Sequence, residues 1–290
     1  MQLRQLIKES TETVSACYPE GEAREMVFAY LEHAFGTRKY THIVEPEYEI
    51  PEDGVVRARA DFSRMASGEP LQYVTGKAYF YGRSFNVSPS VLIPRPETEI
   101  LCQKVVEECR GRKGLRLLDL CTGSGCIAWT LALEMPGTEV TAVDISEDAL
   151  RIAGGQDFAE ELSRTGASTP SFVRADVLGQ PMSGPEQYDV IVSNPPYVTE
   201  SEKAFMRSNV LDHEPHLALF VPDDDPLIFY RAVAGWAHVM LKPGGYGIVE
   251  INEAFASDTE EIFRNLDFVS VQTIRDLHEK DRFVAFRKGK

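Results

Sequence analysis

The segment with the clearest chemical character combines a carboxamide, a rigid turn and an aromatic ring. It follows the apolar run Val190 to Ser193 and reads Asn194-Pro195-Pro196-Tyr197. An amide or aryl amine is a poor nucleophile because its lone pair is delocalised, so a catalyst must hold the nitrogen and accept its hydrogens. The Asn194 side-chain oxygen can accept one N–H, the Pro195 carbonyl can accept the other, and the Tyr197 ring can stack on the planar group. The segment therefore indicates methylation of a planar nitrogen, although a strand that runs into a Pro-Pro turn would give the same pattern.

A predicted strand, a glycine turn and a helix lie upstream of this segment. The apolar run Leu115 to Leu120 opens into Cys121-Thr122-Gly123-Ser124-Gly125, and a helical stretch follows from Cys126 to Met135. Glycines let the backbone approach a ligand closely, and a helix N-terminus offers it unpaired N–H groups. The next predicted strand, Glu139 to Val143, ends in Asp144, whose carboxylate can accept both hydroxyls of a ribose. These features predict a nucleoside-binding site.

The spacing of the glycines favours a cofactor without phosphates. Gly123 and Gly125 are followed by Cys126-Ile127-Ala128 and not by the third glycine of a dinucleotide site. S-adenosylmethionine has a ribose and no phosphate, so it fits this turn better. A purely structural role for Asp144 remains open, because it precedes a helix for which Ser146 is a good N-cap.

With these motifs the chain resembles the methyltransferases that modify the glutamine of the Gly-Gly-Gln motif in peptide chain release factors. Two segments are specific to that family, Glu-Pro-Leu-Gln-Tyr and Ile-Pro-Arg-Pro-Glu-Thr-Glu, whereas other methyltransferases share the glycine turn and Asn-Pro-Pro-Tyr. Further similar segments are Gly68 to Gly76, Phe80 to Gly82, Val91 to Glu99, His213 to Leu219 and Leu241 to Gly245.

The resemblance implies a set of site residues. S-adenosylmethionine would be bound by Asp144 and by the turn residues Cys121, Thr122, Gly123, Ser124 and Gly125. Asn194 would lie between cofactor and substrate, with Asn194, Pro195 and Tyr197 in catalysis. Pro195, Pro196 and Tyr197 would frame the glutamine. The resemblance also leaves two roles open for Arg95, direct contact with the cofactor or only the start of a helix.

The chain departs from the family pattern at three places. The family often has an aromatic residue that packs on adenine, whereas this chain has Val177, so the contact would be apolar. The helix after Asp144 often carries an alanine-x-x-asparagine pattern. Here Ala153 is followed by Gly154-Gly155-Gln156, which predicts a weakened or bent helix. The segment Pro222 to Pro226 replaces a glycine-containing loop of many relatives.

Composition agrees with a cytoplasmic enzyme. The 290 residues carry a formal charge of −15, which argues against broad binding to a phosphate backbone and hence against a nucleic-acid substrate. No apolar run approaches a membrane span of roughly eighteen residues. His213 and His216 lack partners at metal-ligand spacing, so no metal site is expected. The five cysteines, an odd number, show no paired spacing of the metal-binding type and are interpreted as reduced.

The periodicity of apolar residues predicts three segments. Residues 1–75 have helical patterns, such as Ala23 to Phe35, and form an expected substrate-recognition domain. Residues 76–93 form an expected β-hairpin linker around Gly82-Arg83, and residues 94–290 an α/β methyltransferase domain. Its sheet is expected to be Rossmann-like, seven-stranded and mostly parallel, with the last pair of strands antiparallel. The predicted strands are Leu115–Leu120, Glu139–Val143, Ser171–Arg174, Tyr188–Ser193, Tyr246–Ile251, Phe268–Ile274 and Arg282–Phe286.

Three functions are compatible with these motifs. The first is transfer of methyl from S-adenosylmethionine to the side-chain amide nitrogen of a glutamine in a class I peptide chain release factor, a protein partner. The second is adenine-N6 methylation of nucleic acid, since an adenine amine presents the same planar donor pair to Asn194 and Tyr197. The third is an inactive adaptor that binds the cofactor. The negative charge disfavours the second function, and intact Asn194 and Tyr197 disfavour the third.

Overall fold

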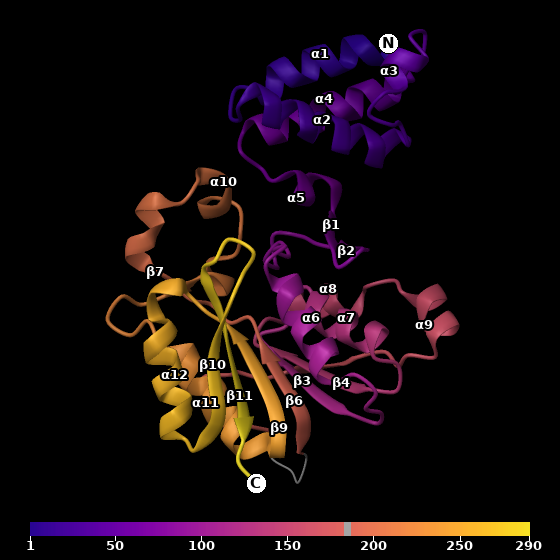
Figure 1. Ribbon diagram of the computed structural model, residues 1–290. Helices are drawn as coiled ribbons and strands as arrows, with labels where there is room; N and C mark the ends of the chain where they lie inside the picture. The colour runs from indigo at the N-terminus through magenta and orange to yellow at the C-terminus, as the bar shows by residue number, and fades with distance from the viewer. Residues whose placement is uncertain (183–186) are drawn as a thin grey trace. The chain divides into compact units, whose positions relative to one another are not determined.

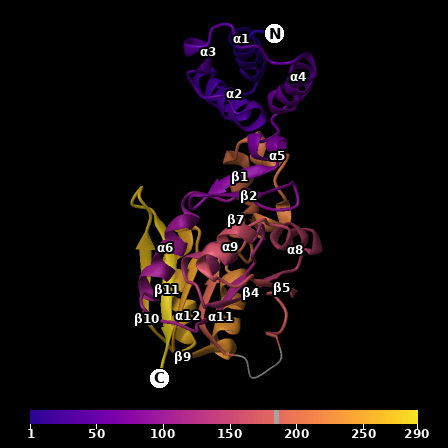
Figure 2. The same ribbon diagram turned by 90° about the vertical axis from the view of Figure 1, so that its right-hand side faces the viewer.

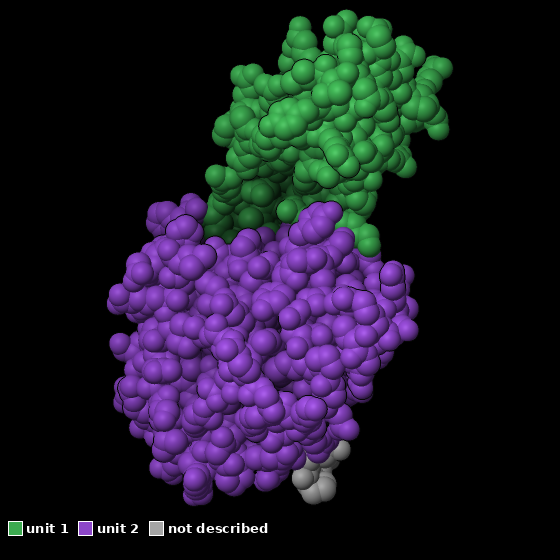
Figure 3. All heavy atoms as spheres, turned by 45° about the vertical axis from the view of Figure 1, so that its right-hand side comes forward, with its two compact units in different colours: residues 1–77, 206–214 green, residues 78–205, 215–290 purple. Residues whose placement is uncertain are grey.

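The protein is described here from a computed structural model that covers residues 1–182 and 187–290. The chain forms two compact units, coloured separately in Figure 3. The first unit contains Met1–Lys77 and Met206–Glu214, and the second contains Ala78–Phe205 and Pro215–Lys290.

The first unit is helical (Figure 1). The helix predicted from Ala23 to Phe35 is confirmed, and it begins three residues earlier, at Glu20, directly after Pro19. Val27, Tyr30 and Leu31 of its apolar face are buried. The helices of this unit are α1 (Leu3–Val14), α2 (Glu20–Phe35), α3 (Thr41–Val44), α4 (Glu52–Ala66), α5 (Leu71–Thr75) and α10 (Ser208–Leu211).

A hairpin follows the helices. Strands β1 (Lys77–Phe80) and β2 (Arg83–Asn86) form a two-stranded sheet. The two residues between them, Tyr81 and Gly82, both have positive φ angles, of 49° and 72°. That backbone twist is the one that two-residue hairpin turns require. The predicted hairpin around Gly82 is therefore confirmed.

The second unit is built on a seven-stranded sheet in the order β10-β11-β9-β6-β3-β4-β5. The neighbouring pairs from β9 to β5 are parallel, and β11 is antiparallel to both β9 and β10. All seven predicted strands are present. Their bounds are β3 (Arg116–Leu120), β4 (Glu139–Asp144), β5 (Ser171–Arg174), β6 (Tyr188–Ser193), β9 (Leu241–Glu250), β10 (Phe268–Arg275) and β11 (Asp281–Lys288).

Helices cover both faces of this sheet (Figures 1 and 2). Alternate residues of β3 point to opposite faces, so Leu117 packs in one apolar core and Leu118 in the other. Helices α6 (Thr98–Glu108) and α7 (Cys126–Glu134) belong to the first core. Helices α11 (Ile228–Met240) and α12 (Ala256–Asn265) belong to the second. The short apolar runs of the central strands follow from this burial on two sides.

Several short elements complete the second unit. Helix α8 (Glu147–Gly154) has only eight residues and ends at the glycine pair, where a weakened or bent helix was expected. The remaining elements are α9 (Ala159–Thr165), β7 (Val198–Thr199), β8 (Phe220–Val221), η1 (Glu200–Phe205), η2 (His216–Ala218) and η3 (Glu253–Phe255). The parallel pair β7–β8 was not predicted, because each strand has two residues and leaves no pattern. Within the described ranges, no helix has the length and apolar character needed to cross a membrane.

Candidate active site

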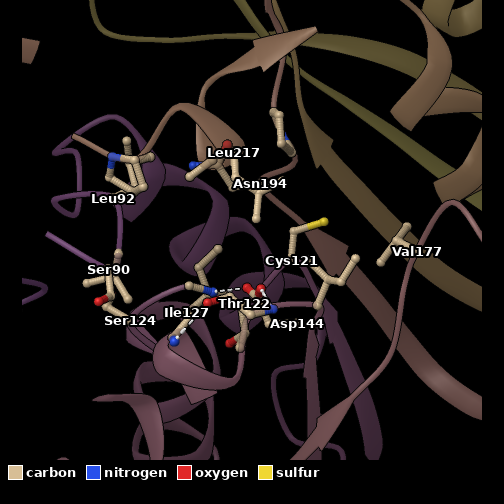
Figure 4. Close-up of a pocket in the computed structure, with 18 of the residues that line it drawn as sticks. Ser90, Leu92, Cys121, Thr122, Ser124, Ile127, Asp144, Val177, Asn194 and Leu217 are labelled. Carbon is tan, nitrogen blue, oxygen red and sulfur yellow. Dashed lines mark hydrogen bonds between the residues drawn. The ribbon is translucent and has the colours of Figure 1, made fainter. Parts of the chain in front are cut away.

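The carboxyl ends of three neighbouring strands meet at one cavity. Cys121 follows β3, Asp144 is the last residue of β4 and Asn194 follows β6. Since these strands are parallel neighbours, the three side chains lie along one edge of the sheet (Figure 4). The cavity there has a volume of about 330 Å³, within the range of small-molecule sites.

Most of the predicted site residues line this cavity. Those that do so are Cys121, Thr122, Gly123, Ser124, Asp144, Val177, Asn194 and Pro196. Three predicted residues, Gly125, Pro195 and Tyr197, lie outside the described lining. Arg95 lines the cavity as well, together with Leu92 from the same segment.

The glycine turn has backbone angles that glycine adopts readily and other residues rarely adopt. Gly123 and Gly125 have φ angles of 55° and 78°, in the left-handed region that side chains disfavour. At Gly125 a Cβ atom would also lie 2.9 Å from the Cβ of Ala153 in α8. The second glycine therefore allows α7 and α8 to pack closely. Gly125 thus serves helix packing and does not line the cavity.

Asp144 is fixed by the backbone on both sides. Its Oδ2 accepts the Gly123 N–H at 2.9 Å and its Oδ1 accepts the Ser146 N–H at 2.9 Å. Ser146 is the N-cap of α8, because its hydroxyl accepts the Ala149 N–H at 3.2 Å. Asp144 therefore has a structural role, since it holds the glycine turn and the start of α8 through these N–H groups. This role does not exclude a ligand role, since each carboxylate oxygen has a second lone pair.

The lining suits S-adenosylmethionine. Asp144 supplies a held carboxylate with acceptor capacity for ribose hydroxyls, and it is partly buried at the cavity wall. Burial raises the pKa of Asp144, and the N–H groups of Ser146 and Gly123 counteract that rise by stabilising the ionised form. Val177 and Leu178 provide an apolar wall beside it. Val177 lines the cavity, as an apolar contact with adenine requires, and that contact stays a prediction.

A second acid lies directly beneath the turn. Asp119 in β3 is fully buried, and its Oδ2 accepts the hydroxyl hydrogen of Thr122 at 2.6 Å. Burial raises the pKa of Asp119 to about 7, and the negative charge of Asp144 adds to the rise. The Thr122 hydrogen bond acts in the opposite direction. Asp119 thus links the strand to the turn and titrates near neutral pH.

Cys121 in the turn and Cys126 at the start of α7 are unsuited to nucleophilic chemistry. Burial raises the pKa of Cys121 well above its usual value and raises the pKa of Cys126 to about 12. Both thiols are consequently protonated at neutral pH, and a thiol is a weak nucleophile compared with a thiolate. We therefore assign neither cysteine a role as a nucleophile.

Asn194 is partly buried and belongs to a chain of hydrogen bonds that includes the buried residues Thr98 and Glu250. Its Nδ2 donates to Thr98 Oγ1 at 3.2 Å, and the Thr98 hydroxyl donates to Glu250 Oε2 at 2.7 Å. The Tyr197 hydroxyl donates to the other carboxyl oxygen of Glu250 at 2.9 Å. Burial raises the pKa of Glu250, and the hydrogen bonds from Thr98 and Tyr197 counteract the rise. The stacking of Tyr197 on a substrate stays a prediction, because its ring packs partly against the second core.

Sequence reasoning gave no role to Thr98 or Glu250. Thr98 stands in the Ile-Pro-Arg-Pro-Glu-Thr-Glu segment, and Glu250 is the last residue of strand β9, which pairs in parallel with β6. An acid at the carboxyl end of a parallel strand was the signal that pointed to Asp144, and the same signal is present at Glu250.

Gln156 is another residue whose role the sequence did not indicate. Its Nε2 donates to the Ser124 carbonyl at 3.1 Å and to the Asn86 carbonyl at 2.9 Å. Its Oε1 accepts the Asn86 N–H at 2.7 Å. Gln156 thus holds the glycine turn against the end of β2.

An open parallel sheet with a nucleoside-type cavity at its carboxyl edge and an adjacent Asn-Pro-Pro-Tyr segment defines a methyltransferase of the Rossmann-like class. Comparison with known families agrees. Residues 96–215 match the methyltransferase small domain, and residues 5–76 match the PrmC N-terminal domain.

Comparison with individual proteins identifies the family. The chain is 47% identical to a release factor glutamine methyltransferase of Bacteroides thetaiotaomicron over 222 residues, which are 77% of each chain. It is 32% identical to that of Flavobacterium psychrophilum over 276 residues, which are 94% of each chain. The chain therefore belongs to the release factor glutamine methyltransferase family.

The chain is also similar to a solved structure whose name describes the same activity as that of these two relatives. It is the protein-(glutamine-N5) methyltransferase (release factor-specific) of Alicyclobacillus acidocaldarius, with 29% identity and a TM-score of 0.41. The match covers 71% of this chain and 100% of that chain.

Proposed function

We propose that the protein transfers a methyl group from S-adenosylmethionine to the side-chain amide nitrogen of the glutamine in the Gly-Gly-Gln motif of class I peptide chain release factors. The observation that carries the proposal is the position of Asn194, whose carboxamide lines the same cavity as Asp144. A hydrogen-bond acceptor for an amide and an acceptor for a ribose thus share one small space. The proposal includes a cytoplasmic location, since translation termination takes place there.

The residues of the cavity divide into two groups in this mechanism. Asp144 and the turn from Cys121 to Ser124 would hold the cofactor, which supplies an electrophilic methyl group when bound. Val177 would contact the adenine. Asn194 Oδ1 would accept one hydrogen of the substrate amide, which orients the nitrogen lone pair for in-line attack.

The proline pair would support this orientation. Pro195 and Pro196 are buried and have fixed φ angles, so the backbone next to Asn194 has little freedom. The Pro195 carbonyl is proposed as acceptor for the second amide hydrogen. Once the carbon–nitrogen bond forms, the nitrogen becomes acidic and releases its proton. No side chain is assigned as the base.

The helical unit is proposed to recognise the protein substrate. Residues 1–75 contain thirteen acidic and eight basic residues, so their surface suits a basic partner. A release factor must approach ribosomal RNA, and a basic surface serves that purpose. In this proposal the domains are residues 1–75 for recognition, 76–93 for the hairpin linker and 94–290 for catalysis.

The experiment is a methyl-transfer assay with a radiolabelled methyl group, in which release factor, DNA and RNA are offered separately. Label should enter only the release factor, and mass spectrometry should place it on the glutamine of the Gly-Gly-Gln peptide. A release factor with that glutamine replaced by asparagine is the control. Label in DNA or RNA instead would favour adenine-N6 methylation, which the charge of −15 disfavours.

A further inference from the structure

The hydrogen-bond chain behind Asn194 has a direction that the chemistry of its members determines. An ionised carboxylate can only accept hydrogen bonds, a hydroxyl has a single hydrogen to donate, and a carboxamide can donate or accept. Glu250 accepts the hydroxyl hydrogen of Thr98 at 2.7 Å. The Thr98 oxygen has then no hydrogen left, so it can only accept.

This leaves one orientation for the Asn194 amide. Its Nδ2 must face Thr98, to which it donates at 3.2 Å, because the Thr98 oxygen can only accept, and its Oδ1 must face the other way. Without a fixed partner the two ends of an asparagine amide are nearly equal in shape and can exchange by rotation. Exchange would put N–H groups where the substrate amide also has N–H groups, and the two would repel.

We infer that Glu250, acting through Thr98, is a positioning residue that holds Asn194 as a hydrogen-bond acceptor and so makes the site select a carboxamide over a carboxylate. The inference rests on the proposed function, because it specifies the substrate group that Asn194 receives. Glu250 and Thr98 are only 1% and 2% exposed, so water cannot substitute for either partner. Buried polar networks of this kind fix one arrangement when all their members are satisfied.

The Tyr197 hydroxyl is the second hydrogen-bond donor to the Glu250 carboxylate. It donates to Glu250 Oε1 at 2.9 Å, so each carboxyl oxygen receives one O–H donor. Arg282 is a nearby positive charge that further favours the ionised form of Glu250. Burial acts in the opposite direction and raises the pKa of Glu250, but in the structure both of its carboxyl oxygens accept an O–H hydrogen bond.

The test compares two peptides that differ in one group. One contains Gly-Gly-Gln and the other contains Gly-Gly-Glu, whose carboxylate accepts hydrogen bonds but has none to donate. The two dissociation constants are measured by calorimetry for the wild type, Glu250→Met, Thr98→Val and Thr98→Ser. Glu250→Met removes the acceptor, Thr98→Val removes the hydroxyl at nearly constant shape, and Thr98→Ser retains the hydroxyl.

The wild type and Thr98→Ser should prefer the glutamine peptide to a similar degree. In Glu250→Met and Thr98→Val the preference should fall by about tenfold, because Asn194 can then present its N–H groups. Turnover on the glutamine peptide should fall with it, while affinity for S-adenosylmethionine stays within about twofold. Thr98→Val separates orientation from charge, since Glu250 remains in place.

An unchanged preference in folded Thr98→Val would overturn the inference, whatever Glu250→Met does. A loss of affinity for both peptides by the same factor in the two variants would also overturn it, because a structural role acts equally on both. The proposed function has a separate criterion. If wild-type enzyme transfers no methyl group to release factor, that function is wrong, whereas the peptide preference still reports the orientation of Asn194.

Discussion

Asn194 is the side chain on which turnover should depend most strongly. Replacing it with alanine removes the acceptor that is proposed to orient the substrate amide but leaves the proline pair and the strand before it unchanged. We expect turnover to drop by about 10²-fold or more, because an oriented hydrogen bond at a reacting centre is lost. Affinity for S-adenosylmethionine should change much less. Turnover of Asn194→Ala within a few-fold of wild type, measured at saturating substrate, would show that the assigned role is wrong.

Asp144 should govern the affinity for the cofactor. Asp144→Ala removes a carboxylate that is proposed to accept two ribose hydroxyls, at a cost of roughly 1.5–3 kcal/mol in binding. The Gly123 and Ser146 N–H groups lose their acceptor in the same variant, so some stability should be lost too. Asp144→Asn keeps the size and one acceptor oxygen and is the matched comparison. Calorimetry that finds unaltered cofactor affinity in folded Asp144→Ala would leave only the structural role.

The buried Asp119 should make stability depend on pH. Its pKa is about 7 in the folded protein, against an ordinary value of 3.8, so the folded state binds a proton that the unfolded state releases. The stabilisation is complete below pH 3.8 and is lost as pH rises to about 7. The loss is at most about 1.4 kcal/mol per pH unit.

Denaturant unfolding of the wild type and Asp119→Asn at pH 5 and pH 8 measures this effect. The asparagine does not titrate, so the stability of the wild type relative to Asp119→Asn should fall between the two pH values. Asp258→Asn, at an exposed position in α12, is the control for general effects of charge. A difference between wild type and Asp119→Asn that is equal at both pH values would contradict the expected titration.

At the scale of elements, one glycine of β9 allows an aromatic ring to pack across two strands. A Cβ atom at Gly247 would lie 2.2 Å from the Phe286 ring of β11, which is its neighbour in the sheet. Gly247→Ala should therefore destabilise the protein by about 1–3 kcal/mol through overpacking. The measurement is the free energy of unfolding in urea.

Gly235 in α11 provides the opposite case. A Cβ atom there meets nothing within 4 Å, and the residue lies inside a helix. Gly235→Ala should stabilise the protein by up to about 1 kcal/mol, since alanine favours helix more than glycine does. If Gly247→Ala and Gly235→Ala change the free energy of unfolding equally, a clash with the Phe286 ring is not what destabilises Gly247→Ala.

The elements that the sequence predicted are those with a strong local pattern. Short apolar runs gave all seven strands of the sheet, and the rule that parallel strands align their carboxyl ends brought Cys121, Asp144 and Asn194 together. The link between Thr98 and Glu250 could not be found in this way. The two residues are 152 positions apart, and their contact depends on how α6 packs against the end of β9. A strand pattern predicts which face of the sheet a residue occupies. A hydrogen bond between distant residues can be predicted only when the packing of the helices against the sheet is known.

At the scale of the whole molecule, the first unit is assembled from two distant parts of the chain. Met206–Glu214 belongs with Met1–Lys77, and Arg207 pairs with Glu22 at 3.3 Å. No local pattern in this short segment indicates that association. Deleting residues 1–75 would leave the segment without its partners, so surface substitutions are the better test of the recognition role.

One stretch of the helical unit has the character of a protein contact surface. Ile43 and Val44 in α3 are 65% and 76% exposed, and the exposed acids Glu45 and Glu47 lie within the next three residues. Grouped apolar side chains at a surface are typical of binding sites, and adjacent negative charge favours a basic partner. We expect this stretch to contact the release factor at a distance from its Gly-Gly-Gln motif.

The prediction is that Ile43→Ser combined with Val44→Ser raises KM for whole release factor by about tenfold, because two apolar contacts are lost. A short Gly-Gly-Gln peptide lacks the second contact surface, so its methylation should hardly change. Val56→Ser is the control, at a residue of α4 that is 64% exposed and lies outside this stretch. Steady-state kinetics on both substrates decide the matter. An equal fractional loss on protein and peptide would mean that α3 supports the fold of the enzyme and does not select the partner.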